Sequence, residues 1–532
     1  MSPALIPKLS PSPSAAASVI LRLSAYGIVV LVGYILSKIV YNIFLHPLRK
    51  YPGPTTWAAT RVPWCWHQCR GLNYRRLLQL HTKYGHVVRI GPNEISYTTS
   101  TAWKTIYGHR RQEMGKDPVF SLHTPTGVQN ILTADRPTHT RQRRTLAHAF
   151  SEKALREQED ILQSYTTAFL SGVEARRHQP IDIGAWFMFT TFDLISDLSF
   201  GDRVGCLAKG DYDPYVSATP AISKELQYYQ MLKYWGIEWA RKYFMPAAVA
   251  GARQTNMRRA MSTVNDRIKR NDTTDRKDFL HYILAANDDK GMSRQEIDVN
   301  AFSISTAGSE STATALAGAV FHLLQNTDTY QTLTHEIRSA FPTSEAITLS
   351  AITAKNLPYL HAVLQETMRL YPPVAVTLPR RVPHEEDGVI IDGRPVPAGT
   401  TVGVNYFAAF HSPHNFHLPE KFAPERWLTD SSTDKSSSSS SYANDNRDVV
   451  QPFSVGPRNC LGKNLAWAEM QLVLSRLLWA YDVHWPEKGL DGSREGADDG
   501  WQSEQKLFGF WVKPPLMVCL EPVERGHGNE KD

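Results

Sequence analysis

The chain is poor in cysteine and has no long block of one charge. Its five cysteines are an odd number scattered over 532 residues, whereas a small secreted domain has a dense, even disulfide framework. The formal net charge is only +6, and no basic block stands out, so nucleic acid is excluded as the expected partner. The middle of the chain lacks a repeat or a linker-like stretch, which favours one large domain despite the length.

One long hydrophobic run is present, and it lies near the N-terminus. A polar tail, residues 1–18, precedes a largely apolar stretch at 19–45 that contains Lys38. The stretch reaches the roughly 20 residues that cross a bilayer if the Lys38 side chain extends to the interface. We expect one uncleaved transmembrane anchor. A cleaved signal peptide is the alternative, but an obvious small-residue cleavage site is missing.

The residues after the anchor predict its orientation. Arginine and lysine are more frequent after residue 45 than before residue 19, so the positive-inside rule directs the main body to the cytosol. Residues 46–54 are rich in proline and predict a stiff hinge. The rest of the chain, 55–532, is expected to form the main domain.

Periodicity predicts a mainly α fold with a small β region. Helical spacing dominates from about residue 140, and strand-like pieces are confined to residues 87–97, 389–396 and 507–520. Residues 431–446 contain a serine-rich run. This segment is too polar to pack, so we expect a disordered surface insertion that touches neither neighbouring motif.

The most specific motif surrounds Cys460. It reads Phe453-x-x-Gly456-x-Arg458-x-Cys460-x-Gly462, and a chain of this length matches it by accident about once in ten thousand tries. A cysteine thiolate on haem iron favours cleavage of an oxygen–oxygen bond. The glycines let the backbone turn sharply and approach a flat macrocycle. A helix predicted over 462–482 places the positive end of its dipole near the sulfur. A buried, unliganded cysteine in a glycine turn is the alternative.

This loop resembles the haem-binding loop of the cytochrome P-450 monooxygenases, and residues 451–470 resemble the fungal microsomal, secondary-metabolism branch. The resemblance implies the cytochrome P-450 fold and a haem (heme b) whose axial ligand is Cys460. It implies that Phe453 shields the thiolate and that Arg458 contacts a propionate. It also implies the endoplasmic reticulum membrane as location and NADPH–cytochrome P-450 reductase as electron donor, with cytochrome b5 as a second donor.

A long helix is expected from the capping box at Ser293 and Glu296. It continues to about residue 325, on the order of 45 Å. Its middle, 307–312, contains small and hydroxylic residues. Glycine inside a helix costs about 1 kcal/mol, so close approach of a flat ligand is one explanation, and a helix crossing is the other.

The resemblance assigns roles to three residues in that helix. It implies proton delivery by Glu310 and an oxygen-side hydroxyl from Ser311. Serine replaces the threonine usual in the family, which removes the methyl group that restricts χ1. Thr312 is a candidate substitute for Ser311.

A third signature is Glu366-x-x-Arg369, with Arg426 further along the chain. Glu366 and Arg369 share a helical face and can pair. The pair alone is weak evidence, because about one or two such spacings occur by chance in a chain this long. The resemblance implies that these three residues form a buried structural network and are not catalytic.

Further basic residues are candidates for haem and partner binding. His139 and Arg143 lie on one predicted helical face, and Arg380 follows a double-proline turn. All three are expected to meet haem propionates, a role that the resemblance supports. A solvated basic surface is the alternative. Three other cations are expected on the proximal surface, where an acidic electron donor docks: Arg141, Arg144 and Lys463.

Two clusters resemble metal ligands by composition only. The cluster at 65–69 lacks a second ligand pair at zinc spacing, and Pro413 interrupts the helix that would align His411, His414 and His417. We interpret both as packing and surface chemistry.

The sequence therefore predicts a haem-thiolate monooxygenase that inserts one oxygen atom from O2 into a lipophilic small molecule, a terpenoid or polyketide intermediate. Four apolar and aromatic segments are expected to line its pocket: 120–128, 228–244, 374–378 and 507–510. One alternative is a haem-thiolate isomerase or peroxide-using enzyme without a reductase. The other is a non-catalytic haem sensor.

Overall fold

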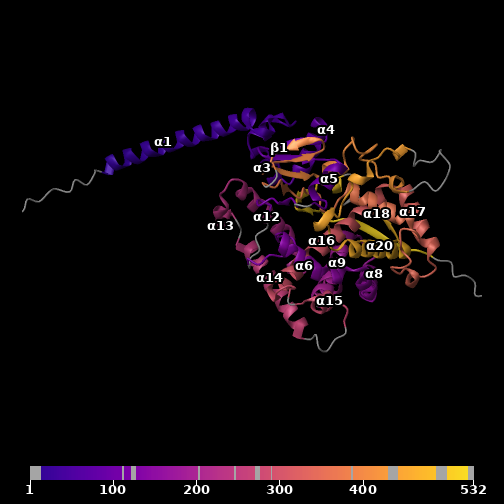
Figure 1. The fold of residues 1–532 in the computed structure, drawn as a ribbon. Coiled ribbons are helices and arrows are strands. Elements are labelled where there is room, and N and C mark those ends of the chain that lie inside the picture. Colours follow the sequence, from indigo (N-terminus) through magenta and orange to yellow (C-terminus); the bar gives the residue numbers. More distant parts are fainter. Residues whose placement is uncertain are drawn as a thin grey trace, which may run out of the picture.

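The computed structural model describes residues 13–110, 113–120, 127–201, 204–244, 247–269, 276–288, 290–384, 387–428, 441–486 and 500–524. The fold is mainly helical with small sheets, which confirms the predicted fold class. One long N-terminal helix extends away from a body in which the other elements gather (Figure 1).

The N-terminal helix, α1, spans Pro13–Val40 and continues as a π-helical turn, η1, over Tyr41–Leu45. Residues 20–45 form a helix long and apolar enough to cross a membrane, and none of its most apolar window is buried in the protein. This agrees with the predicted anchor.

Residues 46–54 form a packed corner. A 3-10 turn, η2, spans Pro47–Lys50, and the Leu48 side chain inside it is fully buried. The Arg89 backbone N–H donates to the Pro52 carbonyl at 2.7 Å. Just before the corner, Asn42 Nδ2 donates to the Ala59 carbonyl at 2.9 Å. The predicted hinge is therefore attached to the domain on both sides.

The main sheet has five strands in the order β1-β2-β8-β5-β3. Its members are β1 Val87–Gly91, β2 Glu94–Tyr97, β3 Gly115–Lys116, β5 Arg380–Arg381 and β8 Thr401–Val404. Strands β2 and β8 run parallel, with Ile95 opposite Val402. The other sheets contain β4 Ile181–Asp182, β6 Val389–Ile391, β7 Arg394–Val396, β9 Tyr481–His484, β10 Lys506–Phe508, β11 Phe510–Val512 and β12 Met517–Pro522.

All three predicted strand regions contain strands. Helices dominate from about residue 140, as expected, but four helices after α1 already precede that point: α2 Thr55–Ala59, α3 Val62–Cys69, α4 Asn73–Tyr84 and α5 Ser100–Tyr107. From there to residue 286 the α-helices are α6 Arg136–Ala147, α7 Glu152–Glu157, α8 Glu159–Glu174, α9 Ile183–Phe200, α10 Cys206–Lys209, α11 Pro214–Ser217, α12 Thr219–Tyr234, α13 Arg241–Phe244, α14 Ala247–Lys269 and α15 Phe279–Ala286.

The later helices are α16 Arg294–Gln325, α17 Thr327–Ala340, α18 Pro358–Leu370, α19 Tyr406–Phe410, α20 Lys463–Ala480 and α21 Gly500–Ser503. Short 3-10 turns are η3 His148–Phe150, η4 Glu238–Ala240, η6 Ser344–Ala346, η7 Pro424–Trp427, η9 Arg447–Val449 and η10 Gly456–Arg458. The predicted capping box of Ser293 and Glu296 starts α16. Helix α20 ends before the predicted residue 482, because Tyr481 begins β9.

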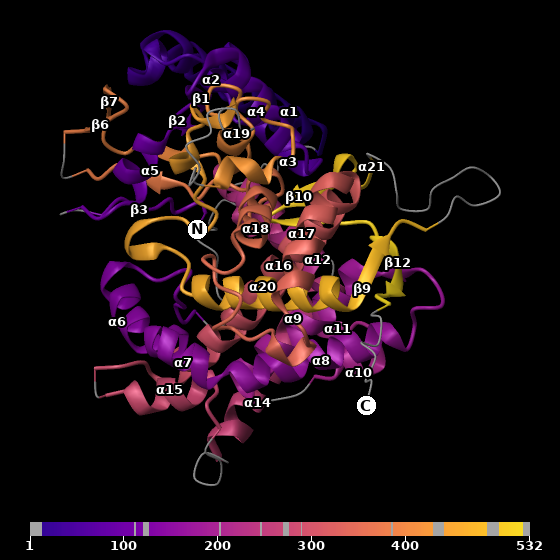
Figure 2. The same cartoon turned by 90° about the vertical axis from the view of Figure 1, so that its right-hand side faces the viewer.

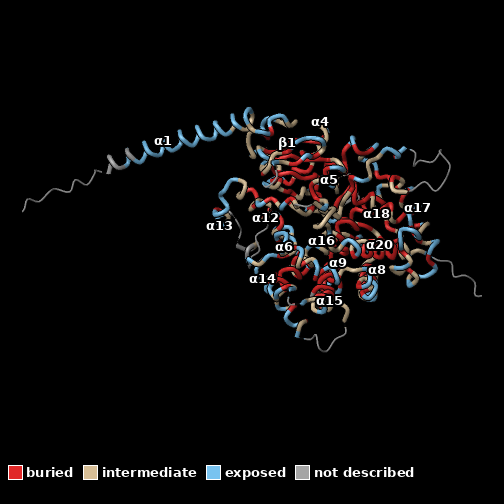
Figure 3. The backbone as a smooth tube through the Cα atoms, in the orientation of Figure 1, coloured by how far each residue is buried: buried red, intermediate tan, exposed pale blue. Residues whose placement is uncertain are grey.

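The centre of the body is built around α16. Helix α16 packs against α9, α18 and α20, and these helices lie together in the middle of the domain (Figure 2). Most of their residues are buried (Figure 3). A Cβ on Gly308 would lie 2.8 Å from Ile195 of α9, and one on Gly318 would lie 2.5 Å from Tyr371. Of the two explanations given for the small residues of 307–312, the contact at Gly308 therefore favours the helix crossing.

The predicted insertion 431–446 is partly wrong. Residues 431–440 lie outside the described residues, but 441–446 pack against the domain. The Tyr442 ring is buried and lies 4.1 Å from the Arg426 guanidinium. Asp445 forms an ion pair with the same guanidinium. This segment therefore contacts one of the neighbouring motifs.

Removal of residues 1–40 is expected to leave the stability of the domain unchanged, because α1 buries none of its most apolar window. The measurement is thermal unfolding of residues 41–532 beside the full chain in detergent. Adding Leu48→Ala to the shortened chain should cost about 2–5 kcal/mol, since it opens a cavity at a fully buried position. Equal stability of the two shortened chains would contradict the packed corner.

Candidate haem site

The Cys460 loop is closed by a backbone bond and by one glycine. The Cys460 N–H donates to the Phe453 carbonyl at 2.8 Å. Gly456 has φ +77°, and a Cβ there would lie 1.9 Å from the Tyr107 carbonyl at the end of α5. Gly462 has φ −85°, and the nearest atom to an added Cβ is in Phe150 at 3.8 Å. A sharp turn that requires glycine is therefore present at Gly456 and absent at Gly462.

The Cys460 sulfur lies in a recess. The residue is exposed, yet protein surrounds it closely enough that burial raises the pKa of the thiol. The Gly462 backbone N–H and the charges of Arg143 and Lys463 act in the opposite direction and favour the thiolate. The sulfur also lies just before the N-terminus of α20, where the helix dipole favours an anion.

Five basic residues gather near the loop, and we call them the basic cluster: Lys116, His139, Arg143, Arg380 and Arg458. Burial and the other four lower the pKa of His139 to about 3. Burial, Arg458 and Arg380 lower the pKa of Lys116 to about 7. Positive charge is therefore in excess, although Glu113 forms an ion pair with Arg458.

The contacts of the arginines show how they are held. Arg143 donates to the Asn459 carbonyl at 2.8 Å, and Arg458 donates to the Ala134 carbonyl at 2.9 Å. The Arg380 guanidinium lies 5.2 Å from the Tyr107 ring centroid. A haem carries two negatively charged propionates, which would balance this excess of positive charge. The Cys460 thiol and the basic cluster beside it therefore fit a haem.

Lys116 was not found from the sequence. It lies on the two-residue strand β3, which is too short to give a periodic signal. Its pairing with β5, where Lys116 is opposite Arg380, brings it into the basic cluster.

The three predicted residues of α16 point to different partners. Ser311 is partly exposed and its hydroxyl donates to the Ala307 carbonyl at 2.7 Å. Thr312 is buried and hydrogen-bonds to Glu469 of α20. Glu310 forms an ion pair with Lys513. Of the two hydroxyls, Ser311 is the one on the accessible side of the helix.

Glu469 is a second site residue that the sequence did not single out. Its side chain is buried in α20, and burial raises the pKa of this carboxyl to about 8, with the Thr312 hydroxyl acting in the opposite direction. A carboxyl group that is neutral near pH 7 can hold a proton beside α16. The available signal was a glutamate among the apolar residues of the helix that follows the Cys460 loop.

Glu366, Arg369 and Arg426 form one buried ion-pair network. The Glu366 carboxylate accepts from Arg369 Nε at 2.9 Å and from Arg426 Nε at 3.1 Å. All three side chains are fully buried in these pairs. Arg369 also donates to the Phe410 carbonyl at 2.8 Å. The network joins α18 to η7.

The expected docking cations are not equally available. Arg141 forms an ion pair with Glu296 at 2.6 Å. This pair connects α6 to the N-terminal capping box of α16. Arg144 and Lys463 are exposed.

His411 contacts Glu420 at 3.1 Å, and the described residues contain no group of three or more histidine, cysteine or acidic side chains arranged to hold a metal.

Comparisons with known proteins agree with this site. A model of the family described as Cytochrome P450 matches residues 52–498. Cytochrome P450 monooxygenase aclL of Aspergillus oryzae is 39% identical, with 94% of this chain and 97% of that protein covered. Cytochrome P450 monooxygenase stcF of Emericella nidulans is 39% identical, with 92% and 98% covered. Cytochrome P450 monooxygenase astJ of Aspergillus oryzae is 37% identical, with 92% and 94% covered.

The chain belongs to the cytochrome P450 family. It is an oxidoreductase of the class that incorporates oxygen, and membership of the family implies a haem-thiolate iron cofactor.

Substitution Arg426→Met should lower the free energy of unfolding by about 3–5 kcal/mol, because it leaves the buried Asp445 carboxylate without its arginine and removes one of the two arginines that pair with Glu366. Arg144→Met is the matched control. Its pair with Asp288 is more than half exposed on both sides, so the expected cost is under about 1 kcal/mol. Denaturant unfolding measures both. Similar costs would contradict the network.

Substitution Glu469→Gln should flatten the dependence of stability on pH. Folded Glu469 keeps its proton up to about pH 8, whereas the unfolded residue loses it above about 4.5. Burial of Glu469 therefore carries no charge penalty below about pH 4.5, and folding loses stability as the pH rises from there to about 8, by on the order of 5 kcal/mol in all. Melting temperatures between pH 5.5 and 8.5 test this. The exposed Glu504→Gln is the control, and an unchanged slope in Glu469→Gln would contradict the assignment.

Proposed function

We propose that the chain is a membrane-anchored haem-thiolate monooxygenase that inserts one oxygen atom from O2 into a lipophilic small molecule, a terpenoid or polyketide intermediate of fungal secondary metabolism. The observation that carries the proposal is the basic cluster beside Cys460, since Arg143 lies close to both the Cys460 thiol and His139. It supports Cys460 as the iron ligand, with Phe453 packed on the loop.

The haem, when bound, supplies the activation of dioxygen. The protein holds the thiolate through Gly462 and Arg143. Ser311 has a hydroxyl on the accessible side of α16, where it can donate a proton or hold a water. Glu310 delivers protons only when its ion pair with Lys513 opens. The neutral carboxyl of Glu469 is a second proton store, linked to α16 by Thr312.

A membrane location is supported by more than α1. The aromatic residues Trp66 of α3, Trp239 of η4 and Tyr243 of α13 are 61%, 67% and 69% exposed. These elements lie on the side of the body from which α1 extends (Figure 1). Amphipathic aromatic rings favour the membrane interface. We infer an endoplasmic reticulum membrane protein with its domain in the cytosol.

Electrons come from NADPH–cytochrome P-450 reductase in this proposal, with cytochrome b5 as a second donor. Lys463 follows the Cys460 loop directly and is exposed, as is Arg144 of α6. They offer positive charge to an acidic partner, and such charge mainly accelerates association.

Substitution Cys460→Ser tests the proposed function. The reduced wild-type protein with carbon monoxide should give the strongly red-shifted Soret band of a thiolate-bound haem, because thiolate donates electron density to the iron. The variant should lack this band and NADPH-dependent oxidation. Haem-dependent turnover retained in the variant would contradict the proposal. Turnover without NADPH would favour the peroxide-using enzyme or the isomerase, and gas binding without oxygen consumption would favour the sensor.

A further inference from the structure

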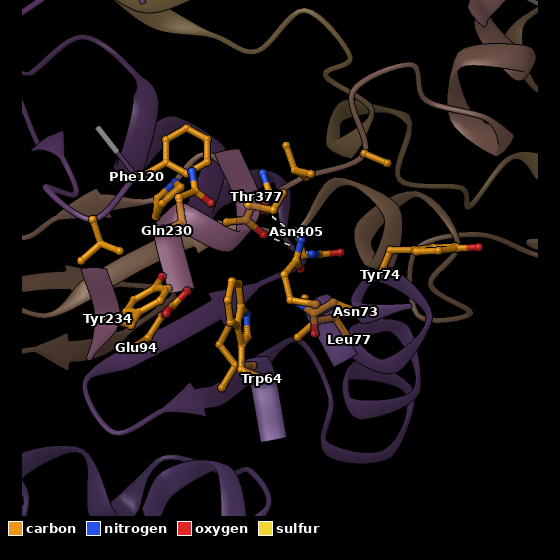
Figure 4. Close-up of a pocket in the computed structure, with 17 residues that line it drawn as sticks. Trp64, Asn73, Tyr74, Leu77, Glu94, Phe120, Gln230, Tyr234, Thr377 and Asn405 are labelled. Atoms are coloured by element: carbon orange, nitrogen blue, oxygen red, sulfur yellow. Dashed lines mark hydrogen bonds between the residues drawn. The ribbon is translucent and has the colours of Figure 1, made fainter. Parts of the chain in front are cut away.

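A pocket lies between α3, α4, the main sheet and α12 (Figure 4). Three of the four segments that the sequence predicts for a substrate pocket contribute to it, through Phe120, through Gln230 and Tyr234, and through residues 375–377. Segment 507–510 is not part of its lining. The lining is less apolar than predicted, because amide side chains occur among the aromatic ones.

The pocket adjoins the haem site along two stretches of chain. Pro379 lines the pocket, and the next residue, Arg380, belongs to the basic cluster. Asn405 also lines it, and the next residue, Tyr406, is buried close enough to Arg380 and Cys460 for their charges to act on the pKa of its hydroxyl, which burial raises. A molecule in the pocket is therefore next to the elements that hold the haem.

Two amide side chains in the lining lack a partner at one polar atom. Gln230 and Asn73 are 5% and 6% exposed, and neither Gln230 Nε2 nor Asn73 Oδ1 has a hydrogen bond. The neighbouring amides are paired, since Gln68 donates to Gln227 at 2.9 Å. A buried polar atom without a hydrogen bond destabilises the folded protein. A ligand that accepts a hydrogen bond from Gln230 Nε2 and donates one to Asn73 Oδ1 would remove this destabilisation.

The charge of the lining indicates a neutral ligand. Glu94 is the one charged residue among the 17 that line the pocket, and it forms an ion pair with Arg61. A ligand carboxylate or ammonium would have to be buried without a counter-ion. Trp64, Tyr74 and Phe120 add aromatic surface for a flat ring.

We propose that this pocket binds the oxygenated end of a neutral aromatic substrate, with a hydroxyl group donating to Asn73 Oδ1 and a carbonyl group accepting from Gln230 Nε2. The inference rests on the proposed function and narrows its substrate to the class of hydroxylated, ketone-bearing aromatic rings, as aromatic polyketides have. A terpene hydrocarbon would leave both amide atoms unpaired.

The test uses the full-length holoenzyme in detergent at pH 6 and three probes: 2,6-dihydroxyanthraquinone, whose hydroxyls are free to donate and stay protonated at this pH, anthracene and anthraquinone-2-carboxylate. Equilibrium dialysis gives their affinities for wild type, Gln230→Met and Asn73→Leu, with Gln331→Met on the exposed face of α17 as the control. Each pocket variant should weaken dihydroxyanthraquinone about tenfold, the effect of one hydrogen bond. Anthracene should change less than about twofold, and the carboxylate should bind wild type more weakly than the neutral quinone.

A second measurement separates ligand binding from a structural role. If the two amide atoms are retained for a ligand, removing them should raise the melting temperature of the ligand-free variants while lowering affinity. Use of two variants keeps the test decisive if one fails to fold. Unchanged affinities, equal losses for quinone and anthracene, or a carboxylate that binds as tightly as the quinone would each overturn the proposal.

Failure of this inference and failure of the proposed function give different results. The carbon monoxide band of wild type and NADPH-dependent oxygen consumption report on the function alone. A normal band with unaltered quinone binding in both variants would overturn the pocket assignment and keep the monooxygenase. If the wild-type protein lacks the band but both variants lose quinone binding, the pocket assignment stands and the monooxygenase proposal is overturned.

Discussion

The proposed haem site depends on the balance between burial of the Cys460 sulfur and the groups that favour its anionic form. Burial alone favours the neutral thiol of Cys460, and the Gly462 N–H, Arg143 and the N-terminus of α20 act against it. These groups are held by backbone geometry. Gly456 lets the loop lie against the end of α5 without a clash, and the bond from Cys460 to Phe453 closes it. The donors are therefore in position before any ligand binds, so the thiolate needs little reorganisation.

The basic cluster beside Cys460 holds more positive charge than its own carboxylates balance. Burial first, and repulsion from the neighbouring cations second, lower the pKa values of Lys116 and His139. Such repulsion costs stability unless an anionic group compensates. Binding of a dicarboxylate group there is consequently coupled to folding of β3, α6 and β5, which supply the cluster. The Glu366 network, by contrast, is balanced within the chain.

The sequence predicted features that rest on local chemistry. The α16 capping box and the Cys460 loop depend on short motifs, whereas the expected meeting of His139, Arg143, Arg380 and Arg458 drew on the family resemblance. Features that depend on packing were left open or missed. The small residues of 307–312 admitted two explanations, and the contact of Gly308 with Ile195 of the crossing helix favours packing. Arg141 looked like a docking cation but pairs with Glu296. The strands outside the three predicted regions, which are β3 with Lys116, β4, β5, β8 and β9, gave no periodic signal, because pairing with distant segments defines them.

The middle of α16 serves packing and chemistry on different faces. Gly308 faces α9 and Thr312 faces α20, whereas Ser311 remains on the accessible side. The two carboxyls near this turn have different surroundings. Glu310 is engaged by Lys513, while burial raises the pKa of Glu469 to about 8. A carboxyl with such a pKa carries a proton at neutral pH and can pass it on. Burial thus makes Glu469 the group that holds a proton beside α16, whereas Glu310 is held by its lysine.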